Sequence, residues 1–293
     1  MSTTALPSAP LRVALIGAGT VGTAVAHLLA QAGHSTIGVA SRSADSARRA
    51  SQYLDAPVFD LNERIPSADL FLLGVPDHAV QLIARRLSSV VDSSSVVAHF
   101  AGVIGVEPLA EVARRGAAAV ALHPVQACPD LDTAVARLPG SAWGITTSPT
   151  AEVWAARLVR EDLRGIPIAV SEDARPLWHA AAAATANGLT ALLTISYELL
   201  RAAEIESAAE VLAPLASGVL SNALDRGPGD SLTGPIVRGD VPTVQAHLTA
   251  LGESRELRTA YLHAARLTLS AARLSGRLEP TAHPDLIELL ESA

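Results

Sequence analysis

The chain has 293 residues, more than one core comfortably holds, and 49% of them are hydrophobic while only 3% are aromatic, so we expect two domains with cores of Ala, Val and Leu. Its 22 Lys and Arg stand against 29 Asp and Glu, and no basic block is interleaved with aromatics, which argues against a nucleic-acid partner. With no signal-like start, no uninterrupted apolar span, a single cysteine and no clustered Cys or His, the sequence predicts a cytoplasmic protein without a membrane segment, an intrachain disulfide or a bound metal.

Residues 12–40 predict a strand, a glycine turn, an amphipathic helix and a second strand, which together form a βαβ unit. Downstream, apolar runs separated by helical segments alternate regularly. This alternation indicates a mainly parallel sheet with helices on both faces. The further expected strands are a weak one at 57–59, a fourth at 69–75, and others at 95–100, 117–122 and 142–146.

The glycine turn at 17–22 has the sequence GAGTVG and follows a strand and opens a helix, the context in which this spacing indicates a dinucleotide site. The first glycine permits the tight turn, the second lets the backbone approach a pyrophosphate, and the third allows close packing beneath the helix N-terminus. We therefore predict an α/β Rossmann domain with cofactor contacts at Gly17, Ala18, Gly19, Thr20, Val21 and Gly22.

The end of the second strand suggests which cofactor is bound. NAD-binding domains place an acidic residue there, about 20 residues after the glycines, to hold the ribose 2′-hydroxyl. This chain has Ser41, Arg42 and Ser43 instead. A guanidinium with two hydroxyl donors suits a 2′-phosphate, so we expect NADP; the alternative is a solvated arginine on a loop.

Three more segments lie at expected carboxyl ends of strands, where ligands bind in parallel sheets. We expect Val75, Pro76 and Asp77 beside the nicotinamide-side ribose, with Asp77 acting as a helix cap. His123 is the first candidate for the proton donor, because imidazole titrates near neutral pH, although it could be a structural histidine. His99 is a candidate contact to cofactor or substrate.

The second half of the chain is helical in its periodicity, with breaks at 227–239 and 276–284. We place a Rossmann domain at 1–148, a connecting segment at 149–172 and an all-α helical domain at 173–293. In the helical domain we expect a substrate or nicotinamide contact, or an interhelical hydrogen bond, from a buried Asn187 amide.

Two further polar segments of the helical half are candidates. Thr233 opens a loop that leads into a helix, and Arg238 offers a guanidinium to a carboxylate, while Asp240 is expected to cap the next helix. His179 lies two helical turns before Asn187 and is a weaker donor candidate.

These motifs, together with HFAG at 99–102, LHPVQ at 122–126 and LTGPIVRGD at 232–240, resemble those of the Rossmann-like proteins with a C-terminal domain of unknown function. The group resembles the superfamily of pyrroline-5-carboxylate reductase, ketopantoate reductase and the β-hydroxyacid dehydrogenases, over residues 11–292. The resemblance implies hydride transfer to a C=O or C=N carbon beside a carboxylate, in a cleft between the two domains, and an intertwined dimer.

One departure from the superfamily bears on the chemistry. Ketopantoate reductases and β-hydroxyacid dehydrogenases carry a lysine four residues before an asparagine, and here Ala183 precedes Asn187. We expect an NADPH-dependent reductase of a small, ketopantoate-like 2-keto acid, with a cyclic imine acid reductase or a non-catalytic NADP sensor as alternatives. The alanine-rich helices also predict a homodimer through the helical domain.

Overall fold

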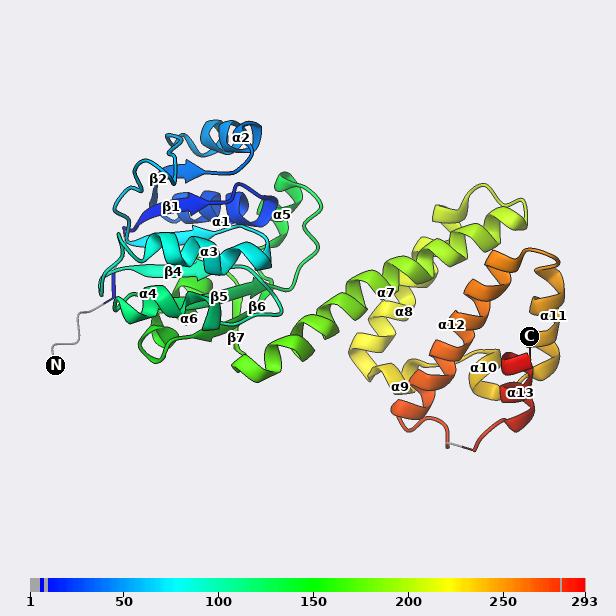
Figure 1. Ribbon diagram of the computed structural model, residues 1–293. Helices are drawn as coiled ribbons and strands as arrows, with labels where there is room; N and C mark the ends of the chain where they lie inside the picture. Colours follow the sequence, from blue (N-terminus) through cyan, green and yellow to red (C-terminus); the bar gives the residue numbers. More distant parts are fainter. Residues whose placement is uncertain (1–5, 8–9, 280, 293) are drawn as a thin grey trace. The chain divides into compact units, whose positions relative to one another are not determined.

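The computed structural model describes residues 6–7, 10–279 and 281–292 (Figure 1). The chain forms two compact units, Met1–Ala183 and Ala184–Ala293, and the boundary between them falls inside helix α7 (Arg175–Ala202). None of the helices in these ranges combines the length and the apolar character that crossing a membrane requires. Each unit is described by itself below.

The first unit is built on a seven-stranded sheet with the order β2-β1-β3-β4-β5-β6-β7. All neighbouring strands pair in parallel except β5 and β6, which are antiparallel. The carboxyl ends of the first five strands therefore share one edge, and the strand order changes direction at β1, where ligands bind in open sheets of this kind. The strands are β1 (Arg12–Ile16), β2 (Ser35–Ala40), β3 (Leu70–Leu73), β4 (Val96–His99), β5 (Ala118–Pro124), β6 (Ala142–Thr147) and β7 (Ile166–Ala169).

Helices cover both faces of this sheet, and each face has its own apolar core. Alternate residues of β1 point to opposite sides, so Val13 and Leu15 join one core while Ala14 and Ile16 join the other. The first core packs against α1 (Thr20–Gln31), α2 (Ala44–Leu54), α5 (Leu131–Arg137) and α6 (Glu152–Arg157), and the second against α3 (Asp77–Leu87), the short 3-10 turn Glu107–Leu109 and α4 (Ala110–Arg114). The predicted α/β class of this half is confirmed.

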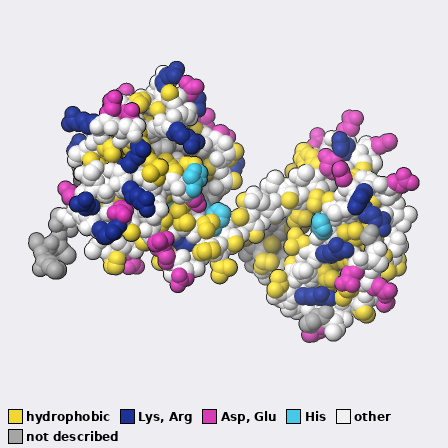
Figure 2. Space-filling model, in the orientation of Figure 1, with side chains coloured by type: hydrophobic (Ala, Val, Ile, Leu, Met, Phe, Trp, Pro, Cys, Tyr) yellow, Lys and Arg dark blue, Asp and Glu magenta, His cyan; other side chains and the backbone are white. Residues whose placement is uncertain are grey.

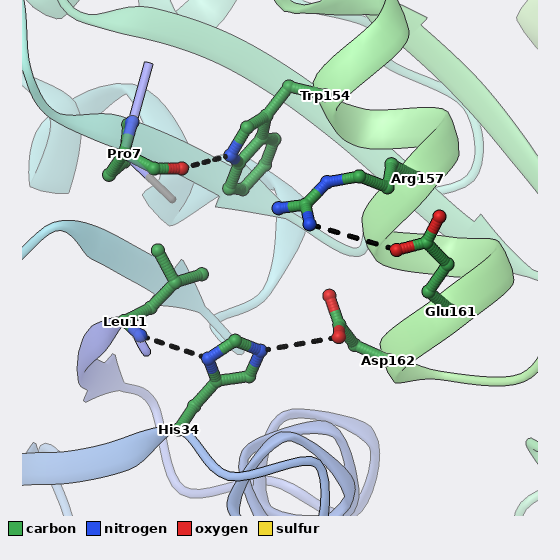
Figure 3. Close-up of polar contacts among 7 residues, drawn as sticks. All are labelled: Pro7, Leu11, His34, Trp154, Arg157, Glu161 and Asp162. Atoms are coloured by element: carbon green, nitrogen blue, oxygen red, sulfur yellow. Dashed lines mark hydrogen bonds and ion pairs between the residues drawn. The ribbon is translucent and has the colours of Figure 1, made fainter. Parts of the chain in front are cut away.

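Polar side chains fasten the amino edge of the sheet (Figure 3). His34, which follows α1, accepts the Leu11 N–H at its Nδ1 over 2.9 Å, so its hydrogen is on Nε2, 3.5 Å from the Asp162 carboxylate. Trp154 of α6 donates its indole N–H to the carbonyl of Pro7 over 2.8 Å. These contacts tie the start of β1 to helical segments that follow β6, at the edge opposite the strand carboxyl ends.

Two parts of the first unit differ from the sequence expectation. Residues 57–59 form no strand, only a single bridge from Val58 to Val39, because Pro57 has no N–H for a ladder and Val58 is exposed. The run at 69–75 is therefore the third strand and not the fourth. The segment 149–172, which we expected to connect the two domains, contains α6 and the edge strand β7 and falls within the first unit.

The second unit is helical throughout its described residues, as predicted. Its core lies among the last four helices and includes Ile236, Val244, Leu262 and Leu286. Many apolar side chains of α7 and α8, by contrast, are exposed in the single chain. After α7 the helices are α8 (Ala208–Arg226), α9 (Pro228–Ser231), α10 (Pro235–Arg238), α11 (Val241–Ala250), α12 (Arg255–Leu274) and α13 (Pro284–Ser292).

Candidate active site

The glycine turn lies directly against the loop that follows β3. Gly17 has a φ of +93°, which favours glycine, and its N–H donates to the carbonyl of Ala40 at the end of β2 over 2.7 Å. A Cβ atom at Gly17 would overlap the carbonyl oxygen of Gly74, and one at Gly74 would overlap that of Gly17. Gly22 is also confined, though less tightly, because its Cβ would stand 3.2 Å from the Gly74 Cα. The predicted roles of the first and third glycines in backbone geometry therefore match the structure.

The amino end of α1 opens onto this turn. Gly19 takes the N-cap position without a side-chain cap, and it is exposed. The first amides of a helix have no partner within the helix, so Thr20 and Val21 present N–H groups near the turn. This arrangement suits an anionic pyrophosphate.

Beyond β2, the side chains at 41–43 differ in how they are engaged. Arg42 is exposed and forms no hydrogen bond or ion pair with any described residue. Ser43 is the N-cap of α2, where its hydroxyl accepts the Ser46 N–H over 3.3 Å and keeps its own hydrogen for donation. An uncompensated guanidinium thus stands two residues past β2, beside a helix N-terminus that also favours anions.

The segment 75–77 follows β3 at the same edge. Pro76, not Asp77, occupies the N-cap position of α3, and no side chain caps that helix. The expectation that Asp77 caps a helix is therefore wrong. Asp77 is the first residue of α3, where a carboxylate is stabilised by the helix dipole and not by a capping hydrogen bond.

His99 ends β4 and is fully buried. Its Nδ1 accepts the Ala101 N–H over 3.2 Å, which leaves the hydrogen on Nε2 for the carbonyl of Gly105 at 2.7 Å. Burial lowers the pKa of His99 to about 4, so the ring is neutral. Both nitrogens thus bind the backbone of the loop 100–106. Because both ring nitrogens already bind this loop, the structure adds no support for the expected direct contact from His99 to cofactor or substrate, which stays a prediction.

Arg175 and Glu172 also bind the backbone of this loop. Arg175 is fully buried and donates to the Ala101 carbonyl over 2.6 Å and to the Thr146 hydroxyl over 3.0 Å. Desolvation lowers the pKa of its guanidinium. The Glu172 carboxylate accepts the N–H groups of Val106 and Glu107 over 3.0 and 3.3 Å. Neither residue is predicted from the sequence, since nothing local signals these long-range contacts.

His123 lies near the end of β5 and is half-buried. Trp178 of α7 donates its indole N–H to His123 Nδ1 over 3.0 Å, and the two rings of His123 and His179 lie 5.4 Å apart. Burial, followed by the charges of His179 and Arg175, lowers the pKa of His123 to about 4. His123 is therefore a neutral imidazole at neutral pH and not the acid that an ordinary histidine pKa would supply.

Two glycines make room for this cluster. A Cβ atom at Gly102 would overlap the His179 ring and would stand 2.9 Å from His123 Nε2. A Cβ atom at Gly144, the residue that pairs with His123 in β6, would stand 2.6 Å from the Trp178 indole. The first unit thus brings together His123, His179 and a tryptophan that the sequence analysis missed.

The remaining predicted site residues belong to the second unit. Asn187 is exposed on α7 and not buried as expected, because the core of its unit forms among α10–α13. Thr233 is exposed before α10, and Arg238 ends that helix with its guanidinium 3.9 Å from Asp240. Asp240 caps α11 by accepting the Thr243 N–H, as predicted. The roles of Asn187, Thr233 and Arg238 in a site stay predictions.

The strand order, the glycine turn and the helix behind it define a dinucleotide-binding α/β fold. The Rossmann-like domain family matches residues 2–124, and a domain of unknown function, DUF2520, matches residues 141–268. The chain thus combines a match to the Rossmann-like domain in its N-terminal half with a match to this domain of unknown function further along, as its motifs indicated.

Curated relatives match only part of the chain. Glycerol-3-phosphate dehydrogenase of the NAD(P)+ type from Staphylococcus carnosus is 33% identical over 103 residues, which is 31% of this chain and 31% of that protein. The chain thus matches about a third of the length of the curated relatives, and this match alone does not extend to their activity.

Solved structures match nearly the whole chain at low identity. A candidate NADP oxidoreductase from Bacteroides fragilis is 22% identical, with a TM-score of 0.74 over 89% of this chain and 98% of that one. Pyrroline-5-carboxylate reductase from Coxiella burnetii is 20% identical, with a TM-score of 0.56 over 91% and 98%. Imine reductase from Myxococcus stipitatus, in complex with NADP+, is 16% identical, with a TM-score of 0.63 over 91% and 94%. These likenesses show that the chain has the fold of NAD(P)-dependent oxidoreductases.

Proposed function

We propose that this protein is an NADPH-dependent reductase of a C=N bond beside a carboxylate in a small substrate. The cofactor assignment rests on the glycine turn and on Arg42, whose unpaired guanidinium suits a 2′-phosphate. It is supported by the imine reductase and a reductive aminase of the same fold, which were solved with NADP+ and NADPH. Ser41, Ser43 and residues 75–77 complete the proposed cofactor contacts.

The observation that favours C=N chemistry is the neutral state of His99 and His123 at the carboxyl edge. His99 uses both nitrogens on the loop, and His123 has a pKa of about 4. Reduction of a ketone must supply a proton to the developing alkoxide, whereas an iminium ion arrives already protonated. A site in which neither histidine is an acid at neutral pH, and in which Ala183 stands where relatives have lysine, suits the second reaction better.

Reduction of a 2-keto acid is the second candidate, and the Nε2 hydrogen of His123 is the observation in its favour. A neutral imidazole can donate a hydrogen bond to a carbonyl oxygen and stabilise the negative charge that develops there. The same hydrogen would bind a carboxylate oxygen of an imine acid. In either reaction Arg238 is our candidate carboxylate clamp, with Asn187 and Thr233 as substrate contacts.

A homodimer is part of the proposal. Helices α7 and α8 expose more apolar side chains than a solvent-facing pair of helices normally carries. Figure 2 shows hydrophobic side chains on the surface of the second unit. A second copy of the chain would cover them. Among them are Leu189, Leu193, Tyr197, Val211, Leu215, Val219, Leu220 and Leu224.

The test begins with binding of NADPH to the purified protein, followed by a panel of cyclic imine acids and 2-keto acids in which oxidation of NADPH is measured. Turnover of imine acids supports the proposal, and turnover of keto acids alone would show that the protein reduces 2-keto acids, the second candidate function. Tight NADPH binding without turnover of either class would favour a non-catalytic sensor, and failure to bind NADPH would refute the proposal. With a substrate found, Arg238→Lys should raise KM more than it lowers kcat, because a point charge cannot reproduce bidentate recognition.

A further inference from the structure

The hydrogen bond between Trp178 and His123 has a fixed direction. An indole N–H can only donate, so the nitrogen that it meets, His123 Nδ1, must accept with its lone pair. A neutral imidazole carries one hydrogen, which is then on Nε2. Protonation of the ring would place a second N–H opposite the indole N–H, across the same 3.0 Å.

The packing of Trp178 holds this contact in place. Its indole lies where a side chain at Gly144 would stand, 2.6 Å from the position of a Cβ atom there. Gly144 is the antiparallel partner of His123 in the sheet, so the tryptophan lies over β6 beside the histidine that it binds. Any larger residue at 144 would displace the indole.

The groups that face His123 also act against a positive charge. The charged or titratable residues that influence it are His179 and Arg175, both on α7, and both lower its pKa after the larger effect of burial. Nε2 lies next to Gly102, in the loop that follows β4, and the His179 ring fills the space that a side chain at Gly102 would occupy. The hydrogen on Nε2 therefore lies at the carboxyl edge of the sheet.

We propose that Trp178 is a positioning residue that holds His123 as a neutral imidazole with its hydrogen on Nε2, so that His123 offers one hydrogen-bond donor and does not act as an imidazolium acid. The donor suits an oxygen of a carboxylate or a carbonyl group. The role of this donor in catalysis rests on the proposed reductase function. The protonation state and tautomer of His123 do not depend on it.

The ring state can be measured without any substrate. In the full-length protein labelled with 15N-histidine, with His123 assigned by loss of its signals in His123→Gln, Nδ1 should have a pyridine-like shift and Nε2 a pyrrole-like shift through pH 6–8. Trp178→Phe keeps an aromatic ring on Gly144 but removes the donor. In this variant the shifts of the two nitrogens should move toward each other, and the pKa of His123 should rise above about 4.

Trp154→Phe is the matched control, because that indole donates to Pro7 at the amino edge of the sheet and should leave His123 unchanged. A pyrrole-like Nδ1 in the parent protein would overturn the inference without any variant, even if Trp178→Phe fails to fold. Unchanged His123 shifts and pKa in a folded Trp178→Phe protein would overturn it as well.

Kinetics then separate this inference from the proposed function. If the protein turns over a substrate, Trp178→Phe should lower kcat by about tenfold, the effect of one lost hydrogen bond of ordinary strength. It should also add a pH dependence as His123 becomes able to protonate, while NADPH affinity stays unchanged. If no substrate is found but the nitrogen shifts are as expected, the proposed function fails while the assignment of the ring stands.

Discussion

Replacing Arg42 with alanine should weaken the binding of NADPH and leave that of NADH unchanged. The guanidinium is exposed and has no partner among the described residues, so its charge is available to a ligand. Opposite charges about 4 Å apart attract by about 1 kcal/mol in bulk water and by about 4 kcal/mol at the effective dielectric near a protein surface. A loss of at least about 1.4 kcal/mol, or tenfold in the dissociation constant of NADPH, is therefore expected.

The assay is a titration followed by the fluorescence of the reduced nicotinamide, carried out with both cofactors. Arg48→Ala is the matched control, because Arg48 is also exposed but already has an ion pair with Asp45 at 2.8 Å. Raising the ionic strength should weaken the binding of NADPH more than that of NADH in the parent protein, and this difference should shrink in Arg42→Ala.

Two results would refute this reasoning. One is equal affinity of the parent protein for NADH and NADPH, which would mean that nothing in the site recognises the 2′-phosphate. The other is a parallel loss of both affinities in Arg42→Ala, which would mean that Arg42 supports the fold of the site or binds a group that both cofactors share.

Further predictions concern the glycine turn, the effect of acid and the assembly. Gly17→Ala should abolish detectable NADPH binding and lower the free energy of unfolding by roughly 1–3 kcal/mol, because the added Cβ atom would meet the Gly74 carbonyl at a residue with a positive φ. Urea unfolding and the NADPH titration test this prediction, and values like those of the parent protein would contradict it. Because the pKa of His99 falls from 6.5 to about 4 on folding, the unfolded chain binds protons more readily, and stability should be lost as pH falls from about 6.5 to 4, by roughly 3 kcal/mol. In urea unfolding at several pH values His99→Gln should show a smaller loss than the parent, and an identical loss would count against this assignment. The parent should be a dimer by light scattering at micromolar concentration, and Leu215→Asp with Val219→Asp, on the exposed face of α8, should shift it toward monomer; a monomeric parent would remove the idea.

Local patterns were sufficient to predict much of the fold. The run that begins at Arg12 and the glycines after it specify a strand, a turn and a helix from neighbouring residues alone, and all three are present. The edge strand β7 was not among the expected strands because Ile166 and Ile168 are exposed, whereas the equally short β3 and β4 are fully buried and form clear apolar runs. β7 is a strand because it pairs with β6 in the folded sheet, a contact that its own sequence does not indicate.

The candidate site was harder to predict, because its hydrogen bonds join distant segments. The sequence places His99 at the end of a strand. The carbonyl that it binds belongs to Gly105, and the two residues meet only because the folded loop between them turns back toward the strand. Trp178 and His123 are 55 positions apart, and no spacing rule connects them. The one available signal was a tryptophan next to His179 in a chain that has three.

The mutual confinement of Gly17 and Gly74 also affects how a dinucleotide would bind. Since each backbone occupies the space in which the other's side chain would stand, the turn after β1 and the loop after β3 lock each other's shape before any ligand arrives. A preorganised turn loses little conformational entropy on binding, and so less of the gross interaction energy is spent on ordering the chain. Calorimetry should then show a modest entropic penalty for NADPH, and the Gly17 and Gly74 amides, which donate to the carbonyls of Ala40 and Ile16, should exchange slowly in the free protein.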